Sequence, residues 1–178
     1  MCKACTAVYK AKYLNFIYIV PSKQKGDFSM EIAIIAHDSK KELITQFCIA
    51  YCGILSKHNI SATSITGKYI SDATGLEIER LLAGKQGGIQ QISSRIAYDE
   101  IDMVLFFRST SQSFGDNLAQ EELETDLIRM CDLHNVPVAT NIATAEALIA
   151  ALDRGDFDWR EIINPKSDYN RRKKNCAL

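Results

Sequence analysis

Short apolar runs alternate with longer segments of helical periodicity from residue 30 onward. The short runs have the length and composition of buried strands, and the longer segments repeat apolar residues every three or four positions, as one face of a helix does. Strands separated by helices in this order favour parallel pairing. The pattern therefore predicts an α/β fold, a single-domain doubly wound and mostly parallel sheet. The predicted strands are residues 31–36, 61–65, 103–107, 136–139 and 162–163.

Helix-start signals follow two of these runs, each a serine or threonine with a glutamate three residues later. Ser39 and Glu42 predict a helix that begins near residue 40. Thr74 and Glu77 predict a second, short helix that Gly84 ends. The remaining helices are predicted at a stripe formed by Ile89, Ile92 and Ile96, at 121–134 with Leu123, Leu127, Met130 and Leu133 inward, and at 142–152.

The composition is that of an ordinary globular chain of one domain. Of 178 residues, 47% are hydrophobic and 24% are charged, which is enough apolar material for a single core. Residues 14–20 form an apolar run that is shorter than the roughly 20 residues needed to span a bilayer. We expect residues 1–29 to be an extension of unknown role and residues 30–178 to be the domain.

Charge and cysteine content narrow the class of partner. A net charge of −1 does not give the basic field expected for nucleic acid or an anionic membrane, so a small molecule or a protein is the expected partner. The six cysteines are expected to be reduced thiols of a cytoplasmic protein, with Cys48 and Cys52 packed in a core. The pair Cys2 and Cys5 lacks two further ligands nearby, so no metal site and no cofactor is predicted.

Candidate binding residues follow the first two predicted strands. His37, Asp38 and Lys41 come after the first strand, and Thr63, Ser64, Thr66 and Gly67 come at the end of the second. Ligands of open parallel sheets bind at this edge, where helix N-termini, a lysine ammonium and hydroxyl groups can hold a phosphate. Gly84 adds a backbone amide that no side chain covers. Each of these residues, taken singly, also has an ordinary structural explanation.

Six motifs occur in an order and spacing that resemble the methylglyoxal synthase family. They are AIIAHDSKK at 33–41, ATSITG at 62–67, SDATG at 71–75, LLAGKQGGIQQ at 81–91, IDMVLFF at 101–107 and VPVATNIATAEALI at 136–149. The resemblance covers most of residues 31–150. It implies a metal-free lyase, usually a homohexamer, that converts dihydroxyacetone phosphate to methylglyoxal and phosphate through an enediolate.

The resemblance also implies roles for individual residues. His37 and Asp38 would sit with the reacting part of the substrate, as catalytic residues. Lys41, Thr63 and Thr66 would hold its phosphate together with the backbone at Gly84. Arg171 resembles a basic element near the end of the family's chains.

Several positions depart from the family pattern on the side of the pocket that transfers protons. The family reads Gly-Gly-Asp-Gln-Gln, with the aspartate as catalytic base, where this chain has Ile89 after Gly87 and Gly88. The family's Trp-Asp is Arg108-Ser109 here, and its later His-Asp-Pro-Asp segment is replaced around residues 120–124. Ala83 stands in place of a serine, and Ile65 in place of a threonine.

Two functions are compatible with these departures. One is a protein that binds phosphate or a small phosphorylated metabolite, with lost or impaired lyase chemistry. The alternative is an active synthase with a substitute carboxylate base, for which the candidates are Asp38, Asp116, Glu121, Glu122 and Glu124. A purely structural protein would leave the convergence of Lys41, Thr63 and Thr66 unexplained.

Overall fold

The computed structural model describes residues 29–109 and 118–157, which form a parallel sheet covered by helices. Its strands are β1 (Glu31–Ala36), β2 (Asn59–Thr63), β3 (Ile78–Leu81), β4 (Met103–Phe107) and β5 (Val138–Ala139). They lie in the order β3-β2-β1-β4-β5, and every neighbouring pair is parallel. The chain winds outward from β1 to β3 and then crosses back to β4, so the predicted doubly wound α/β fold is confirmed.

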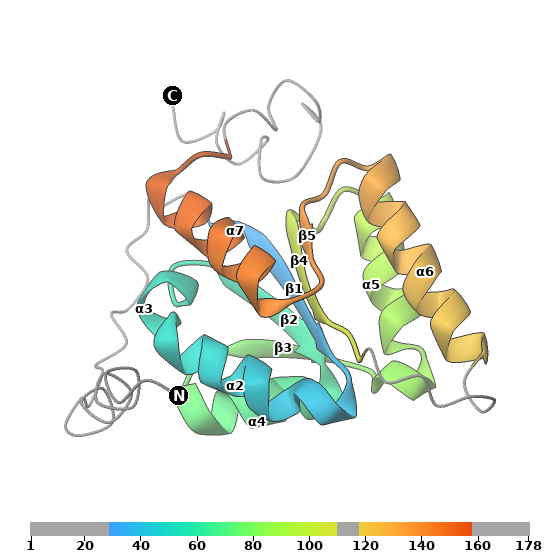
Figure 1. The fold of residues 1–178 in the computed structure, drawn as a ribbon, viewed down its shortest axis with the longest axis horizontal. Helices are drawn as coiled ribbons and strands as arrows, with labels where there is room; N and C mark the ends of the chain where they lie inside the picture. The colour runs from blue at the N-terminus through green and yellow to red at the C-terminus, as the bar shows by residue number, and fades with distance from the viewer. Residues whose placement is uncertain (1–28, 110–117, 158–178) are drawn as a thin grey trace.

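Helices cover both faces of the sheet (Figure 1). One face carries α2 (Lys41–Ala50), the short α3 (Cys52–Leu55), α4 (Ser64–Thr74) and α7 (Ile142–Arg154). The opposite face carries α5 (Gly88–Ala97) and α6 (Leu118–Leu133). Two single turns, η1 (Asp38–Lys40) and η2 (Gly84–Gln86), precede α2 and α5. Helix N-termini therefore gather at the carboxyl edge of the sheet.

The core has two layers because the central strands are buried on both faces. In β1, Ile32 and Ile34 pack against α2, α4 and α7, whereas Ala33 and Ile35 pack against α5 and α6. This two-sided burial explains why β1 and β4 are unbroken apolar runs. The free thiols of the described residues, Cys48, Cys52 and Cys131, are all buried, which confirms the packing role predicted for the first two.

The prediction for residues 61–84 is wrong at two points. The second strand ends at Thr63, and Ser64–Thr74 is a helix, with Gly75 as its left-handed cap at φ +72°. The β-branched residues and Gly67 of this segment have low helix propensity, so the sequence pattern did not predict the helix. Residues 78–81 form the edge strand β3, paired with β2, instead of the helix predicted there, because Thr74 is the last residue of α4 and does not cap a new helix.

Two further predictions about helices need correction. The Ser39 and Glu42 capping box is not formed, because the His37 ring accepts the Ser39 amide and a 3-10 turn precedes α2. Leu133 was expected to face inward, but it is 63% exposed and Cys131 occupies the buried position. The predicted strand at 162–163 and residues 1–28 of the predicted extension lie outside the described residues.

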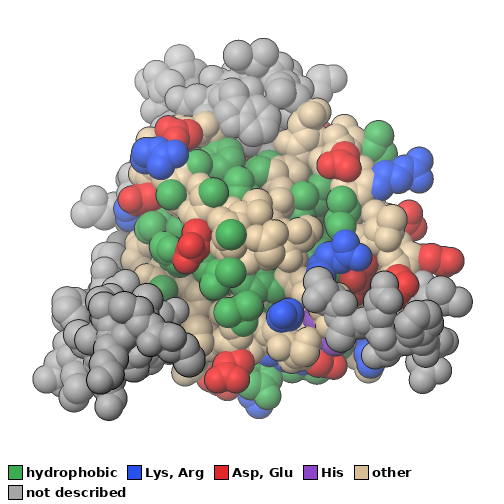
Figure 2. All heavy atoms as spheres, viewed as in Figure 1, with side chains coloured by type: hydrophobic (Ala, Val, Ile, Leu, Met, Phe, Trp, Pro, Cys, Tyr) green, Lys and Arg blue, Asp and Glu red, His purple; other side chains and the backbone are tan. Residues whose placement is uncertain are grey.

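The outer surface of α7 is rich in small apolar side chains. Figure 2 shows hydrophobic side chains gathered on this face, with charged ones mainly around them. Ala143, Ala147 and Ala150 of α7 are exposed there. The helices of residues 29–109 and 118–157 do not include a candidate membrane span.

Candidate functional site

The loop after β1 is tied to the end of β4. The His37 amide donates to the Phe107 carbonyl at 3.0 Å, which extends the β1–β4 ladder by one residue. The ring of His37 folds back so that its Nδ1 atom accepts the Ser39 amide at 3.3 Å. A backbone amide can only donate, so in the neutral form of the ring the proton is on Nε2, which can then donate to a ligand.

Asp38 and Lys41 form an ion pair on the first turn that follows β1. The hydrogen bond from the Lys41 ammonium is the main cause that lowers the pKa of the Asp38 carboxyl, and the charges of Lys41, His37 and Lys85 lower it further. The Lys41 side chain is only 15% exposed, whereas that of Asp38 is 69% exposed. The aspartate thus stays ionised at neutral pH and holds the ammonium at the edge of the sheet.

Thr63 and Thr66 lie at the junction between β2 and α4. Their side chains are buried, and the Thr63 hydroxyl donates to the Thr66 hydroxyl oxygen at 3.2 Å. The Thr66 hydroxyl accepts this bond, so its own proton can be donated to a ligand. Thr63 caps α4 without a side-chain hydrogen bond to the helix amides. The start of α4 therefore offers a hydroxyl donor beside helix amides, a combination that suits an anion.

Gly67 and Gly84 differ in what surrounds them. A β-carbon on Gly67 would lie 3.0 Å from Cγ of Arg80 and 3.4 Å from Ile78, so this glycine lets α4 pack closely on β3. A β-carbon on Gly84 would meet nothing within 4 Å. The packing of α4 explains Gly67 without a ligand. Gly84 instead leaves its backbone open to approach from solvent.

The turn between β3 and α5 is closed by its own backbone. The Gly88 amide donates to the Ala83 carbonyl at 3.1 Å, and Gly87 has φ +101°, a conformation that favours glycine. The side-chain oxygen of Gln91 accepts the Leu82 amide at 2.8 Å. The Ser64 amide donates to the Leu82 carbonyl at 3.4 Å. These bonds place the turn and the N-terminus of α5 beside Thr63 and the start of α4.

Ile89 fills the inner side of the first turn of α5. It is 2% exposed and packs with Ile92 and Ile96 in the core layer under the sheet. The first turn of α5 contains no acidic residue. No proton acceptor is therefore supplied from this turn.

Arg108 and Glu124 form an ion pair at the end of β4. Arg108 Nε lies 3.4 Å from a Glu124 carboxylate oxygen, and the guanidinium carbon lies 5.9 Å from the centre of the Phe106 ring. Glu124 is only 9% exposed, and Gln120 donates to it at 3.5 Å. Glu121 and Glu122 are exposed on α6. Of the carboxylates considered on this helix, Glu124 alone is buried beside the carboxyl edge of the sheet.

Comparison with known proteins identifies the family. A family model described as the MGS-like domain matches residues 46–140. The methylglyoxal synthase of Caldicellulosiruptor saccharolyticus is 57% identical over 148 residues, which cover 82% of this chain and all of the relative. The chain belongs to the methylglyoxal synthase family.

Other members of the family are similar over nearly the same length. The methylglyoxal synthase of Oceanobacillus iheyensis is 49% identical, over 78% of this chain and 96% of the relative. A crystal structure of methylglyoxal synthase from Elizabethkingia anophelis matches with a TM-score of 0.61 and 36% identity, over 69% of this chain and 78% of that one. The sequence resemblance and the α/β fold thus lead to the same family.

The structure of the present chain brings most of the predicted site residues to the carboxyl edge of the sheet. His37, Asp38 and Lys41 follow β1, Thr63 and Thr66 follow β2, and Gly84 follows β3, which lies beside β2. Arg171 lies outside the described residues. The described residues contain no group of three or more side chains of the kinds that hold a metal ion.

Sequence reasoning missed two side chains near this edge. Gln91 braces the β3–α5 turn through the Leu82 amide, and Lys85 acts electrostatically on Asp38. Lys85 and Gln91 both stand inside the 81–91 motif, so their position in that motif was the available signal. Their contacts depend on the arrangement of β3 and α5, and the sequence pattern predicted a helix ended by Gly84 where β3 lies.

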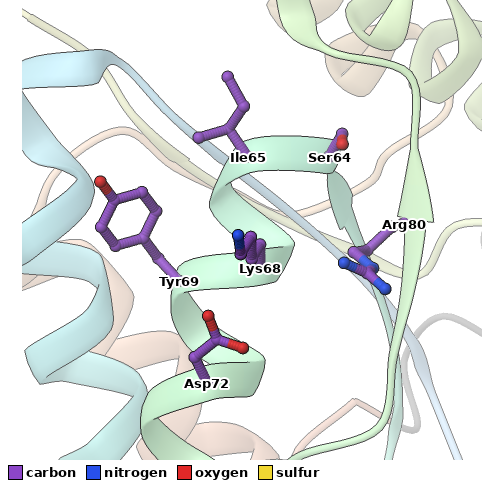
Figure 3. Close-up of a pocket in the computed structure, with 6 residues that line it drawn as sticks. All are labelled: Ser64, Ile65, Lys68, Tyr69, Asp72 and Arg80. Carbon is purple, nitrogen blue, oxygen red and sulfur yellow. The ribbon is translucent and has the colours of Figure 1, made fainter.

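A separate hollow of about 500 Å³ lies on the outer side of α4 (Figure 3). Ser64, Ile65, Lys68, Tyr69 and Asp72 line it from α4, and Arg80 lines it from β3. Of the candidate binding residues, Ser64 belongs to its lining, whereas His37, Lys41, Thr63, Thr66 and Gly84 do not. The hollow thus adjoins the strand-end cluster at Ser64 and extends away from it along α4, where the exposed Lys68 is a convenient control position.

Proposed function

We propose that this chain binds phosphate or a small phosphorylated metabolite such as dihydroxyacetone phosphate at the carboxyl edge of β1 and β2, with lost or impaired lyase chemistry. The arrangement of Lys41, Thr63 and Thr66 supports the binding half of this proposal. An ammonium, a hydroxyl donor and open helix amides are complementary to a phosphate. His37 and Asp38 would lie beside the rest of the ligand, and Arg171 would add a further positive charge.

The observation that carries the second half is the burial of Ile89 in the first turn of α5. The resemblance places the family's catalytic aspartate at this position, between Gly87-Gly88 and the two glutamines. An isoleucine cannot accept the proton beside the substrate carbonyl. Positioned general bases contribute about 10²–10⁴ in rate, so we expect a much slower reaction.

A second candidate function is an active synthase in which Glu124 replaces the missing base. Its burial beside Arg108, close to the end of β4, favours it over the exposed Glu121 and Glu122. Asp38 is a weaker candidate because Lys41 lowers its pKa, and a carboxylate with a lowered pKa is a poorer base. Asp116, the remaining candidate, lies outside the described residues.

Two measurements on the pure protein test these functions. The first is binding of phosphate and of dihydroxyacetone phosphate by calorimetry. The second is formation of methylglyoxal and free phosphate from dihydroxyacetone phosphate. Binding with turnover far below 1 per second supports the impaired lyase, because enzymes ordinarily turn over at about 1–10³ per second. Turnover in that ordinary range that falls at least about 100-fold in Glu124→Gln supports the active synthase instead.

We also propose a cytoplasmic location and a homohexamer. Buried free thiols at Cys48, Cys52 and Cys131 are compatible with a reducing compartment. The small apolar side chains on α7 offer a surface against which another copy can pack. Analytical ultracentrifugation tests the assembly, and a monomer at micromolar concentration would contradict it.

A further inference from the structure

The arginines of residues 29–109 and 118–157 differ in whether a carboxylate holds them. Three form ion pairs with glutamate or aspartate side chains: Arg95, Arg108 and Arg154. Arg80 and Arg129 take part in no ion pair within the described part of the chain, and both are exposed. Their guanidinium groups are therefore open to reagents in solution.

Arg80 extends from the edge strand β3 into the hollow on the outer side of α4 (Figure 3). The stem of its side chain lies beside Gly67, where a β-carbon would stand 3.0 Å from Cγ of Arg80. Glycine at this position thus leaves room for the stem. The guanidinium is turned toward α4, and the carboxylate of Asp72 lines the same hollow. Packing of the stem therefore presents the guanidinium on the side of the hollow that faces a carboxylate.

One end of the hollow adjoins the predicted binding site, because Ser64 lines it and follows Thr63 at the start of α4. A small molecule released from that site along α4 passes Arg80. The relatives described above are synthases of methylglyoxal, a compound with two adjacent carbonyl groups. Carbonyl carbons are electrophilic, so such a product is also a reagent for nucleophilic side chains.

Two adjacent carbonyl groups react with a guanidine by closing a ring. Two guanidine nitrogens each form a bond to one carbonyl carbon, and the carbonyl oxygens become hydroxyl groups by taking up the protons of those nitrogens. Loss of one water then gives a hydroimidazolone, so the reaction needs no oxidant or reductant. An arginine is protonated at neutral pH and must give up a proton before its nitrogen attacks. A neighbouring carboxylate can accept that proton, as a general base does for other nucleophiles.

We infer that Arg80 is a modification site for methylglyoxal and similar α-oxoaldehydes, which convert it to a hydroimidazolone with Asp72 as the proton acceptor. The inference takes from the proposed function only the identity of the reagent, and added methylglyoxal serves equally well. The thiols of the described residues compete little, because Cys48, Cys52 and Cys131 are buried. The reaction removes the positive charge of Arg80 from the hollow.

Pure wild-type protein and added methylglyoxal test this inference. The protein is incubated with a limiting amount of reagent at neutral pH and digested with a protease that does not cut at arginine. Mass spectrometry of the peptides detects a gain of one methylglyoxal less one water. We expect at least about fivefold more adduct at Arg80 than at Arg129, which is also exposed and unpaired but lies on α6, outside the lining of the hollow.

Two matched variants test the role of the carboxylate. Asp72→Asn keeps the shape of the side chain and removes the proton acceptor, so adduct at Arg80 should fall at least about threefold while adduct at Arg129 stays constant. Asp126→Asn removes an exposed carboxylate from α6 and should leave Arg80 unaffected. Both substitutions are at exposed positions and conserve side-chain shape, so the variants are expected to fold.

The contrary results are equally specific. Equal adduct at Arg80 and Arg129 in wild type overturns the inference, because exposure alone would then explain the reaction. An Asp72→Asn variant that reacts at Arg80 as wild type does overturns the role of Asp72. Neither result depends on phosphate binding or on lyase activity, so failure of the proposed function and failure of this inference are distinguishable.

Discussion

Gly88 lies so close to Leu82 that a β-carbon on it would stand 2.1 Å from the Leu82 carbonyl oxygen. That carbonyl accepts the Ser64 amide, and the Leu82 amide donates to Gln91. The contact thus lies where β3, α4 and α5 meet. A side chain at position 88 would force backbone apart at the edge of the predicted phosphate site.

Gly88→Ala should therefore destabilise the domain strongly. The clash is with backbone, which has little freedom to move, so we expect a cost of roughly 2–4 kcal/mol. For a domain of this size, that corresponds to a melting temperature lower by about 5–15 °C. Thermal unfolding followed by circular dichroism measures it. A loss below about 0.5 kcal/mol would show that the turn relaxes freely.

Gly84→Ala is the matched control on the same turn. Open space surrounds its new β-carbon, so stability should change by less than about 0.5 kcal/mol. If the Gly84 backbone approaches a bound phosphate, the added methyl should weaken phosphate binding several-fold without unfolding. Unchanged binding in a folded Gly84→Ala variant would remove Gly84 from the predicted site.

Lys41→Ala should abolish most of the stabilisation that phosphate gives. A ligand present at ten times its dissociation constant stabilises the folded state by about 1.4 kcal/mol, which raises the melting temperature by about 3–6 °C. Differential scanning fluorimetry with and without phosphate measures this rise. Lys68→Ala is the control and should keep it. A full rise in Lys41→Ala would show that phosphate binds elsewhere.

The Asp38 and Lys41 pair should give stability a dependence on acidic pH. Lys41 lowers the pKa of Asp38 below its ordinary value of 3.8. A carboxyl with a lowered folded-state pKa stabilises the protein above its unfolded-state pKa, and this stabilisation is lost as the pH falls through the folded-state value. The effect is small because Asp38 is mostly exposed.

Urea unfolding of wild type and Asp38→Asn between pH 2.5 and 6 measures this effect. Wild type should be the more stable protein at pH 6, and the difference should shrink as the pH falls below about 4. Asp72→Asn, on the exposed side of α4, is the control for removing a carboxylate from the surface. A difference for Asp38→Asn that grows toward low pH would contradict the pairing.

The sequence was sufficient for the central part of this fold because burial on both faces leaves a strong signal. The runs at β1 and β4 are unbroken, and the stripe of Ile89, Ile92 and Ile96 identifies the buried face of α5. At the edge the signal is weak. Strand β3 alternates only partly, with Ile78 and Leu81 half-buried, and α4 is poor in helix-forming residues.

The candidate site was predictable for a related reason. His37, Lys41 and Thr63 stand directly after buried strands, and parallel strands bring their carboxyl ends together. The contacts between these residues were not predictable. The capping of η1 by His37 and the bond between Thr63 and Thr66 depend on side-chain orientation. The approach of Lys85 depends on the arrangement of three strands, which periodicity does not encode.

Ile89→Asp is the substitution that tests the missing base. It restores a carboxylate where the family resemblance places one, so methylglyoxal formation should rise above the wild-type rate. The gain should be partial, because residues that act together in catalysis do not contribute additively, and the segment around Gln120 and Glu124 also departs from the family. Formation of methylglyoxal and phosphate release, measured together, give the rate.

Ile89→Asp is also expected to destabilise the folded protein. Ile89 is buried in the core layer, and an unpaired carboxylate there is costly. Position 89 also lies in the first turn of α5, where the helix dipole favours a negative charge by up to about 1–2 kcal/mol. Since several kilocalories of burial oppose this term, we expect a net loss of roughly 2–4 kcal/mol. The free energy of unfolding must therefore be measured by chemical denaturation for each variant whose rate is measured.

Ile89→Asn separates the catalytic effect of a carboxylate at position 89 from the cost of burying a polar side chain there. Asparagine has nearly the shape of aspartate and is also costly to bury, but it cannot act as a general base at neutral pH. It should lose similar stability and gain no activity. If both variants fold, bind phosphate as wild type does and produce methylglyoxal at the wild-type rate, loss of a single base is not sufficient to explain the proposed impairment. The rest of the pocket, beginning with Arg108 and Glu124, must then differ in function from that of an active synthase.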